Sequence, residues 1–258
     1  MVRNISVFGL ESLPLVKPGD DVARLILNAL ESEHLKLLDG DVIVISQKVV
    51  SKAEGLLEDI SSIKQSAKAR ALAKRTRRDP RLVELILRDS AKVLRADTQA
   101  FVVKRKDGLI CLNAGVDKSN VGGRRVYSRL PIDSDSLANK LRTRLEKLAR
   151  KKLGVIIADT YSRPFRAGQV EFAIGISGID PIVDYRGRED LFGYELRYKY
   201  VGLADEVAAA SELVMGQGTE RTPVAIVRGL TRIKRSKQHG LSKKLLLGKQ
   251  ADLFHGTL

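Results

Sequence analysis

The sequence predicts an α+β fold with mixed, largely antiparallel β-sheets and flanking helices. Apolar runs typical of strands and amphipathic stretches typical of helices alternate irregularly along the 258 residues, without a regular strand–helix repeat. Residues 100–104 and 109–112 also flank the turn-forming stretch 105–108, which is typical of a β-hairpin. Because a hairpin joins antiparallel strands, this motif rules out a purely parallel sheet.

In the first half of the chain, strands are expected at residues 2–8 and 42–45. Asp20 and Asp21 can cap a helix that runs to about residue 32, and Asp79 with Pro80 can begin a helix that runs to about residue 94. Residues 61–78 are predicted to form one strongly basic helix. Such a helix either presents a solvated face or docks a polyanion, and the first is the more common case.

In the second half, residues 113–123 form a polar, glycine-containing loop, and helices are expected at 135–151 and 204–215, the latter ending at Gly216. Strands are expected at 155–157, 170–177, 195–201 and 224–227, with a charged turn at 186–190. Gly175 inside a strand indicates a bulge or a close backbone approach. Residues 1–230 are expected to form the functional region and 231–258 a basic tail; no internal boundary is visible in the composition.

The net charge of +15 requires a partner or another physical reason. It fits polyanion binding, to nucleic acid or to phosphorylated small molecules, and equally fits ion pairing on a heat-adapted surface. The absence of tryptophan, of zinc-finger spacing and of a recognition-helix signature argues against nucleic acid.

The chain lacks the sequence features of a membrane or secreted protein. No apolar run approaches the roughly 18 residues of a membrane span, and the N-terminus has no signal-peptide pattern. Cys111 is the single cysteine, so neither an intrachain disulfide nor a cysteine-based zinc site can form. We therefore expect a cytoplasmic protein.

Oxygen-bearing and cationic side chains follow several predicted strands. Asp159 and Thr160 come directly after the apolar run 155–157, and a carboxylate beside a hydroxyl suits a hard divalent cation. Arg163 and Arg166 could present two guanidinium groups to phosphate or carboxylate oxygens, a role inferred from their chemistry alone. The alternative is an aspartate that caps a turn beside solvated arginines.

Two further segments could bind a nucleotide. Ser46, Gln47, Lys48 and Lys52 follow the strand 42–45 and could contact phosphates or base, although a polar turn with surface lysines also fits. Asp117 and Asn120 are spaced so that both can face one ligand. No GxxxxGK[ST] motif is present, so a Walker-type phosphate loop is excluded.

The order and wording of these motifs closely resemble the coenzyme F420-0:L-glutamate ligase family over about residues 5–230. The resemblance is carried by SLPLV (12–16), SQKVVSKAEG (46–55), NAGVDKSN (113–120), ADTYSRPFRAG (158–168), AIGISG (173–178) and MGQGTERTPVAIVRG (215–229). It implies a GTP-dependent enzyme that adds L-glutamate to F420-0 by γ-glutamyl linkage through an acyl phosphate. Mg2+ or Mn2+, a monovalent cation such as K+, and an intertwined homodimer are implied as well.

The resemblance also implies roles for individual residues. Divalent metal would be held by Asp117, Asp159, Thr160 and Gln217. GTP would be contacted by Leu13, Pro14, Leu15, Ser46, Gln47, Lys52, Asn120, Met215, Gly216, Gln217, Gly218, Thr219, Glu220, Arg221 and Thr222. Some relatives carry Glu at position 217, so Gln217 lowers the charge of the metal site unless its backbone carbonyl is the ligand.

Two alternatives to this function stay open at the level of the sequence. The first is a ligase of the same family that acts on another carboxylate. The second is a non-catalytic protein that binds polyanions or nucleic acid, in which Asp117 and Asp159 would be structural caps.

Overall fold

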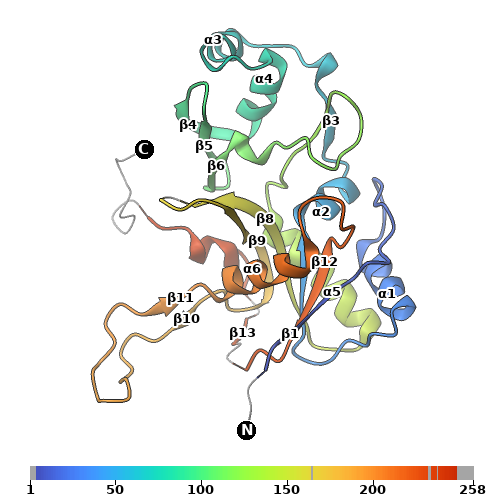
Figure 1. Cartoon of the computed structure of the whole chain (residues 1–258), viewed down its shortest axis with the longest axis vertical. Helices are drawn as coiled ribbons and strands as arrows, with labels where there is room; N and C mark the ends of the chain where they lie inside the picture. The colour runs from blue at the N-terminus through green and yellow to red at the C-terminus, as the bar shows by residue number, and fades with distance from the viewer. Residues whose placement is uncertain (1–3, 164, 232–233, 237, 249–258) are drawn as a thin grey trace. The chain divides into compact units, whose positions relative to one another are not determined.

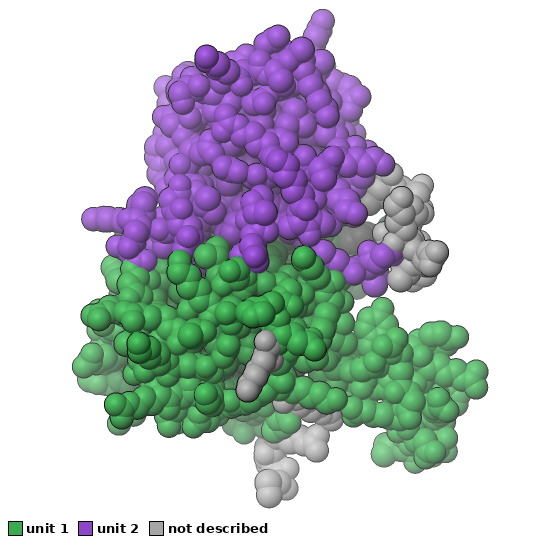
Figure 2. Space-filling model, turned by 180° about the vertical axis from the view of Figure 1, so that it is seen from behind, with its two compact units in different colours: residues 1–15, 21–47, 134–245 green, residues 16–20, 48–133, 246–258 purple. Residues whose placement is uncertain are grey.

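The computed structural model of the chain describes residues 4–163, 165–231, 234–236 and 238–248. The chain folds into two compact units, which Figure 2 shows in separate colours. Unit 1 comprises residues 1–15, 21–47 and 134–245, and unit 2 comprises residues 16–20, 48–133 and 246–258. Each unit is assembled from segments far apart in the chain, so a change of composition along the sequence could not reveal the division.

Unit 1 is built on a six-stranded mixed sheet of order β1-β12-β2-β8-β9-β13 (Figure 1). Its strands are β1 (Ser6–Gly9), β12 (Val224–Arg228), β2 (Val42–Ser46), β8 (Gly154–Ser162), β9 (Gln169–Ile179) and β13 (Arg235–Ser236). Only β2 and β8 run parallel among these neighbours in the described chain, and the other pairs are antiparallel. The predicted mixed, largely antiparallel architecture is confirmed.

Both faces of this sheet are covered. Residues 42–45 of β2 point alternately to the two faces, and all four are completely buried. The helices of unit 1 are α1 (Val22–Ser32), α5 (Ser134–Ala149) and α6 (Leu203–Met215), with a 3-10 helix η3 (Leu241–Leu245). Helix α6 packs Leu203 and Val207 against Val44 and Ile156. Helix α5 packs against β8 and β9, and α1 packs against α5.

The long hairpin β8–β9 contains the irregularity that Gly175 predicted. Ile157 pairs with Gly175 whereas Ala158 pairs with Ala173, so β9 carries one extra residue at this point. A Cβ atom on Gly175 would lie 2.4 Å from the carbonyl oxygen of Ser134 at the start of α5. Both the bulge and the close backbone approach are therefore present.

An arm runs out from unit 1 between β9 and α6. It contains β10 (Val183–Asp184) and β11 (Tyr200–Val201), which pair antiparallel, and Figure 1 shows the connecting residues projecting beyond the six-stranded sheet. Leu191 and Phe192 in that connection are 98% and 94% exposed.

Unit 2 combines two small sheets with helices. Its elements are α2 (Gln47–Ala53), β3 (Leu57–Asp59), α3 (Ala67–Thr76), α4 (Pro80–Asp89), β4 (Ser90–Ala96), β5 (Phe101–Arg105), β6 (Ile110–Leu112) and β7 (Val126–Ser128), with 3-10 helices η1 (Ile60–Ser62) and η2 (Asn113–Gly115). The predicted hairpin is β5–β6, antiparallel within the three-stranded sheet β4-β5-β6. Val83, Ile86, Phe101 and Val103 are fully buried in the core between α4 and this sheet.

Several predicted elements need correction. Residues 61–78 are not one helix, because η1 precedes an extended link and Ser66 caps α3 only from Ala67. The helix begun by Asp79 and Pro80 ends at Asp89 rather than near residue 94, because residues 90–96 pair with β5 as strand β4. The strand predicted at 195–201 is reduced to Tyr200–Val201, and α2 replaces a predicted turn.

The predicted strand at 2–8 appears as β1 from Ser6, while residues 1–3 lie outside the described part. Of the expected basic tail, residues 232–233, 237 and 249–258 also lie outside it, and Leu241 of η3 is fully buried in the core of unit 1. Among the described residues, no helix combines the length and apolar character needed to cross a membrane.

Candidate functional site

The strand directions of unit 1 bring four of the predicted segments to one end of its sheet. Parallel strands β2 and β8 finish at the same end, and antiparallel pairing makes β12 begin there and β1 finish there. Two backbone hydrogen bonds lock the arrangement: Leu10 N donates to Val224 O and Ser46 N donates to Pro223 O, both at 2.9 Å. The segments that converge are 13–15, 46–47, 159–160 and 215–222, and we call them the strand-end cluster.

Thr160 and Gln217, two of the residues expected at a metal, are directly joined within this cluster. Thr160 Oγ1 donates to Gln217 Oε1 at 3.0 Å, and Gln217 Nε2 donates to Glu212 Oε1 at 2.8 Å. The other oxygen of Glu212 accepts a hydrogen bond from Glu171 N at 3.0 Å. Asp159 precedes Thr160 on β8, but neighbouring side chains of a strand point to opposite faces, so it is the Thr160 hydroxyl that meets the Gln217 amide oxygen.

Sequence reasoning missed Glu212. The available signal was its position in the last turn of α6, where the negative end of the helix dipole disfavours a carboxylate. A glutamate in the last turn of a helix indicates a specific hydrogen-bond partner. The structure shows two partners of Glu212, the Gln217 amide group and the Glu171 N–H.

The loop 215–222 is folded around a carboxylate. Gly216 ends α6 as predicted, with φ of +65°, and a Cβ atom there would lie 2.4 Å from the carboxyl carbon of Glu220. Glu220 Oε2 accepts a hydrogen bond from Gly218 N at 2.7 Å. A backbone amide of this loop therefore already holds an anionic oxygen.

Burial separates anchoring residues from accessible ones in the strand-end cluster. Met215 and Thr222 are buried at the two ends of the loop, whereas residues 217–221 between them are exposed. Leu13 is 4% exposed, so its side chain is part of the core, while Leu15 is 72% exposed. Gln47 is buried at the start of α2, and only its neighbours along the chain reach the surface.

In unit 2, Asp117 is surrounded by hydrogen-bond donors. Its Oδ1 accepts from Lys118 N at 2.6 Å and from Ser119 N at 3.1 Å, and its Oδ2 accepts from Ser119 Oγ at 2.5 Å and from Lys48 Nζ. Lys48 is partly buried and also donates to Ser119 Oγ at 2.8 Å. Burial alone would raise the pKa of Asp117, but the hydrogen bonds from Lys48 and Ser119 outweigh it and hold that pKa below its usual value.

The other predicted residues of unit 2 lie on α2 and on the loop after Asp117. Lys52 is one turn along α2 from Lys48, and burial, together with the charge of Lys48, lowers the pKa of Lys52. Lys118 Nζ donates to the carbonyl oxygens of Gly123 and Arg124 and so closes the loop that carries Asn120. Asn120 has a left-handed backbone with φ of +53°.

The donor set fits a divalent cation that keeps part of its water shell. Among the described residues, no three His, Cys, Asp or Glu side chains gather as a ready metal site. Unit 1 instead offers the Thr160 hydroxyl joined to the Gln217 amide oxygen, with Asp159 next to Thr160 along β8, and unit 2 offers Asp117 with the Ser119 hydroxyl. Mg2+ is commonly held by one or two carboxylates together with waters and phosphate oxygens, so these residues fit such an ion.

The two arginines expected to bind substrate lie in the turn between β8 and β9. Arg163 Nη2 donates to Ala167 O at 3.1 Å, which holds the turn closed, and Arg166 is exposed. Residue 164 between them is outside the described chain. No contact joins either arginine to the strand-end cluster in what the structure describes, so their substrate role stays a prediction.

The fold is a mixed α+β architecture whose sheet brings oxygen-bearing side chains and a glycine-containing loop to one end. The comparison with known families is specific: the chain belongs to the F420-0:gamma-glutamyl ligase family, whose model matches residues 11–229.

Individual relatives match almost the whole chain. A coenzyme F420:L-glutamate ligase of Methanothermobacter thermautotrophicus is 43% identical over 252 residues, which is 98% of this chain and 99% of the relative. The ligase of the same name from Methanopyrus kandleri is 43% identical over 249 residues, 95% of this chain and 96% of the relative. That of Methanocaldococcus jannaschii is 39% identical over 252 residues, 98% of this chain and 97% of the relative.

Proposed function

We propose that this chain joins L-glutamate to coenzyme F420-0 by a γ-glutamyl linkage at the expense of GTP, as a step of coenzyme F420 biosynthesis. The convergence of segments 13–15, 46–47, 159–160 and 215–222 at one end of the unit 1 sheet carries the proposal. The names of the relatives, which are coenzyme F420:L-glutamate ligases, supply the substrates.

The proposed chemistry proceeds in two steps. A carboxylate is a poor electrophile, so an oxygen of the F420-0 carboxylate first attacks the γ-phosphorus of GTP, and GDP leaves. The amine of glutamate then attacks the carbon of the acyl phosphate, inorganic phosphate leaves, and the amine loses a proton. Both steps chiefly require positioned reactants and neutralised charge, so the protein needs no nucleophile of its own.

The loop 215–222 is the proposed phosphate-binding element. Gly218 N already donates to the carboxylate of Glu220, and a phosphate oxygen can take the place of that carboxylate oxygen. Ser46 ends the adjacent strand β2 and Gln47 begins α2, while Pro14 and the exposed Leu15 offer apolar surface to the guanine base. In unit 2, Lys52 and Asn120 are proposed to contact oxygen atoms of GTP, as the family resemblance implies.

Two groups of oxygen ligands are proposed to hold Mg2+ or Mn2+: Asp159, Thr160 and Gln217 in unit 1, and Asp117 in unit 2. A divalent cation held by such ligands would withdraw negative charge from the phosphate oxygens of GTP. Thr160 and Gln217 are held in place by their mutual hydrogen bond and by Glu212. A monovalent cation such as K+ belongs to the same proposal, without an assigned residue.

We also propose that the functional form is a homodimer. The support is the arm between β10 and β11, where Leu191 and Phe192 are almost completely exposed in a single chain. Two adjacent large apolar side chains at the end of an arm are typical of a surface that another chain covers.

The test is product formation by the purified chain with F420-0, L-glutamate, Mg2+ and GTP. We expect glutamylated F420-0 in the mass spectrum only when all four are present, and little product when ATP replaces GTP. Product with a different carboxylate at a higher rate would assign the chain to another substrate within the same family. Absence of GTP hydrolysis under every combination would favour the non-catalytic polyanion-binding alternative, which the charge of +15 motivates.

A further inference from the structure

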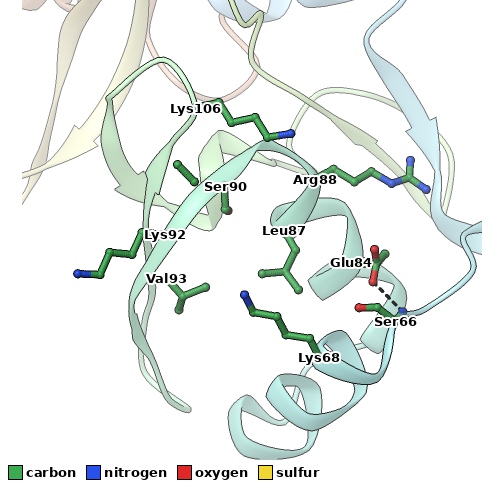
Figure 3. A pocket seen from close by; sticks show the side chains of 10 residues that line it. Ser66, Lys68, Glu84, Leu87, Arg88, Ser90, Lys92, Val93 and Lys106 are labelled. Carbon is green, nitrogen blue, oxygen red and sulfur yellow. Dashed lines mark hydrogen bonds between the residues drawn. The ribbon is translucent and has the colours of Figure 1, made fainter.

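Unit 2 contains a hollow of about 330 Å³ outside the segments proposed to bind nucleotide and metal. It is formed by α3, α4, β4 and the turn between β5 and β6 (Figure 3). Four basic residues line it: Lys68, Arg88, Lys92 and Lys106. Glu84 is the one acidic residue among its lining side chains.

The charges of this hollow do not balance within the described chain. Arg88 is paired with Glu58 at 2.8 Å, and Glu84 accepts a hydrogen bond from Ser66 N at 2.8 Å. For Lys68, Lys92 and Lys106, no carboxylate lies within ion-pair distance among the residues that the structure describes. Two ammonium groups at the hollow and a third at its rim therefore have no carboxylate within ion-pair distance among the described residues.

Lys68 and Lys106 contribute the charge that faces the hollow. Figure 3 shows the ammonium group of Lys68 ending among Leu87 and Val93, with Lys106 reaching over from the β5–β6 turn. The side chain of Lys92 points outward from β4 in the same view, so it lies at the rim.

Lys68 lies at the positive end of a helix dipole. It is the second residue of α3, whose first turn contains no acidic side chain. The Glu84 carboxylate, which accepts a hydrogen bond from Ser66 N at the start of α3, offsets part of the positive charge there, and a bound anion would add to that effect.

The backbone around both lysines is held in place before any ligand arrives. Ser66 accepts a hydrogen bond from Ala69 N at 3.1 Å and thereby fixes the start of α3. Lys106 N donates to Asp89 O at 3.0 Å, which ties the β5–β6 turn to the end of α4. The hollow is thus bordered by segments of fixed conformation.

We propose that this basic hollow binds a compact polyanion, a small molecule with several closely spaced phosphate or carboxylate groups. Its volume accommodates a few such groups and is too small for a nucleic-acid duplex. A triphosphate moiety and a short chain of γ-linked glutamates share this chemistry, because both place negative charges a few bonds apart. The inference depends on the lysines and the hollow alone, and not on the proposed ligase activity.

The test is calorimetric titration of the full chain with tripolyphosphate and, separately, with γ-linked triglutamate, each at constant ionic strength. Two double variants are compared with the wild type. The first carries Lys68→Gln and Lys106→Gln, and the control carries Lys64→Gln and Lys74→Gln. The control pair removes the same charge from exposed positions beside and on α3 that do not line the hollow. Saturating GTP in parallel runs separates this hollow from a nucleotide site that could also take tripolyphosphate.

We expect the Lys68/Lys106 variant to bind at least one of the two anions roughly tenfold more weakly than the wild type, and the control pair to change by less than about twofold. Loss for one anion only identifies phosphate or carboxylate as the ligand chemistry. Hydrogen exchange should show anion-dependent protection at residues 66–68 and 106. Equal losses in both variants would mean diffuse charge attraction and overturn the proposal, as would absence of millimolar binding to either anion. Unchanged melting temperatures verify that both variants are folded.

Discussion

At the scale of single residues, the ion pair between Lys48 and Asp117 has the clearest consequence for metal binding. The Asp117 carboxylate accepts hydrogen bonds from Lys48, Lys118 and Ser119. Burial would raise its pKa, but the hydrogen bonds from Lys48 and Ser119 and the charge of Lys48 together hold that pKa below the usual 3.8. The carboxylate is therefore ionised throughout the neutral range. Its stabilising contribution to the fold is present above pH 3.8 and is lost as the pH falls through the lower pKa of the folded state.

A divalent cation at Asp117 must compete with the ammonium group of Lys48 for Oδ2. We expect Lys48→Ala to bind Mn2+ several-fold more tightly than the wild type in the absence of nucleotide, because one repelling charge is removed. Asp117→Asn should bind Mn2+ more weakly. Electron paramagnetic resonance of free Mn2+ measures both affinities, and identical affinities in the two variants and the wild type would exclude Asp117 as a ligand.

Substitution of Lys52 can distinguish a specific nucleotide site from general attraction between opposite charges. Its partial burial lowers its pKa, so it is desolvated in a way that surface lysines are not. If it meets the phosphates, Lys52→Ala should weaken GTP binding and slow turnover together, by roughly tenfold or more. Lys74→Ala, from the exposed end of α3, is the control for lost charge. Equal, small losses in the two variants would remove Lys52 from the site.

At the scale of elements, α6 organises the end of the sheet by capping the backbone of β9 with two carboxylates. Asp205 accepts from Ala173 N at 3.0 Å, and Glu212, seven residues later on the same helix, accepts from Glu171 N at 3.0 Å. Strand β13 pairs with β9 only at Gly178 and Ile179, so at residues 171 and 173 the outward N–H groups of β9 are satisfied by a helix rather than by another strand. The same contact places Gln217, which follows α6, beside Thr160 of β8.

The cap at Asp205 makes a prediction about stability. Burial raises the pKa of Asp205 above 3.8, so the folded chain holds its proton more tightly than the unfolded chain does. The free energy of unfolding contributed by this group therefore falls as the pH rises from 3.8 through the raised pKa, and is lowest at neutral pH.

Asp205→Asn keeps an oxygen acceptor for Ala173 N and removes the charge. We expect it to be at least as stable as the wild type at pH 7, whereas Asp205→Ala should lose about 1–3 kcal/mol because the buried N–H is left without an acceptor. Urea denaturation at pH 4 and pH 7 measures both. Equal destabilisation by the two substitutions would contradict the proposed cap.

At the scale of the whole molecule, the arm between β10 and β11 predicts the state of association. We expect light scattering at micromolar concentration to give twice the chain mass of 28.5 kDa. Leu191→Glu together with Phe192→Glu should shift the protein to a single chain without loss of its helical signal, because both side chains are exposed in the chain alone. A species of 28.5 kDa for the unmodified protein would contradict the proposed homodimer.

The sequence predicted correctly those elements that depend on interactions between residues close together in the chain. The β5–β6 hairpin and the end of α6 at Gly216 depend on turn chemistry within a few residues, and both are confirmed. The end of α4 was wrong because strand β4 exists through its pairing with β5, which an apolar pattern alone does not reveal. Helix α2 is only seven residues long, too short for a helical period to stand out.

The candidate site also has a part that the sequence could predict and a part that it could not. Its oxygen-bearing residues could be named from motifs at strand ends, but their partners could not, since Lys48 and Asp117 are 69 residues apart and Thr160 and Gln217 are 57 apart. The division into two discontinuous units was likewise invisible, because the chain leaves unit 1 within α2 and returns to it at residue 134.

Transfer of a phosphoryl group from GTP to the carboxylate of F420-0 is the step proposed for the strand-end cluster, and oxygen labelling tests it directly. F420-0 with an 18O-labelled carboxylate is incubated with GTP, glutamate and Mg2+, and the released phosphate is analysed by mass spectrometry. We expect one 18O atom in the phosphate, with neither product nor labelled phosphate from the folded Asp159→Asn variant. Amide product accompanied by phosphate without 18O would contradict the acyl-phosphate route, and full activity of Asp159→Asn at saturating Mn2+ would contradict the site.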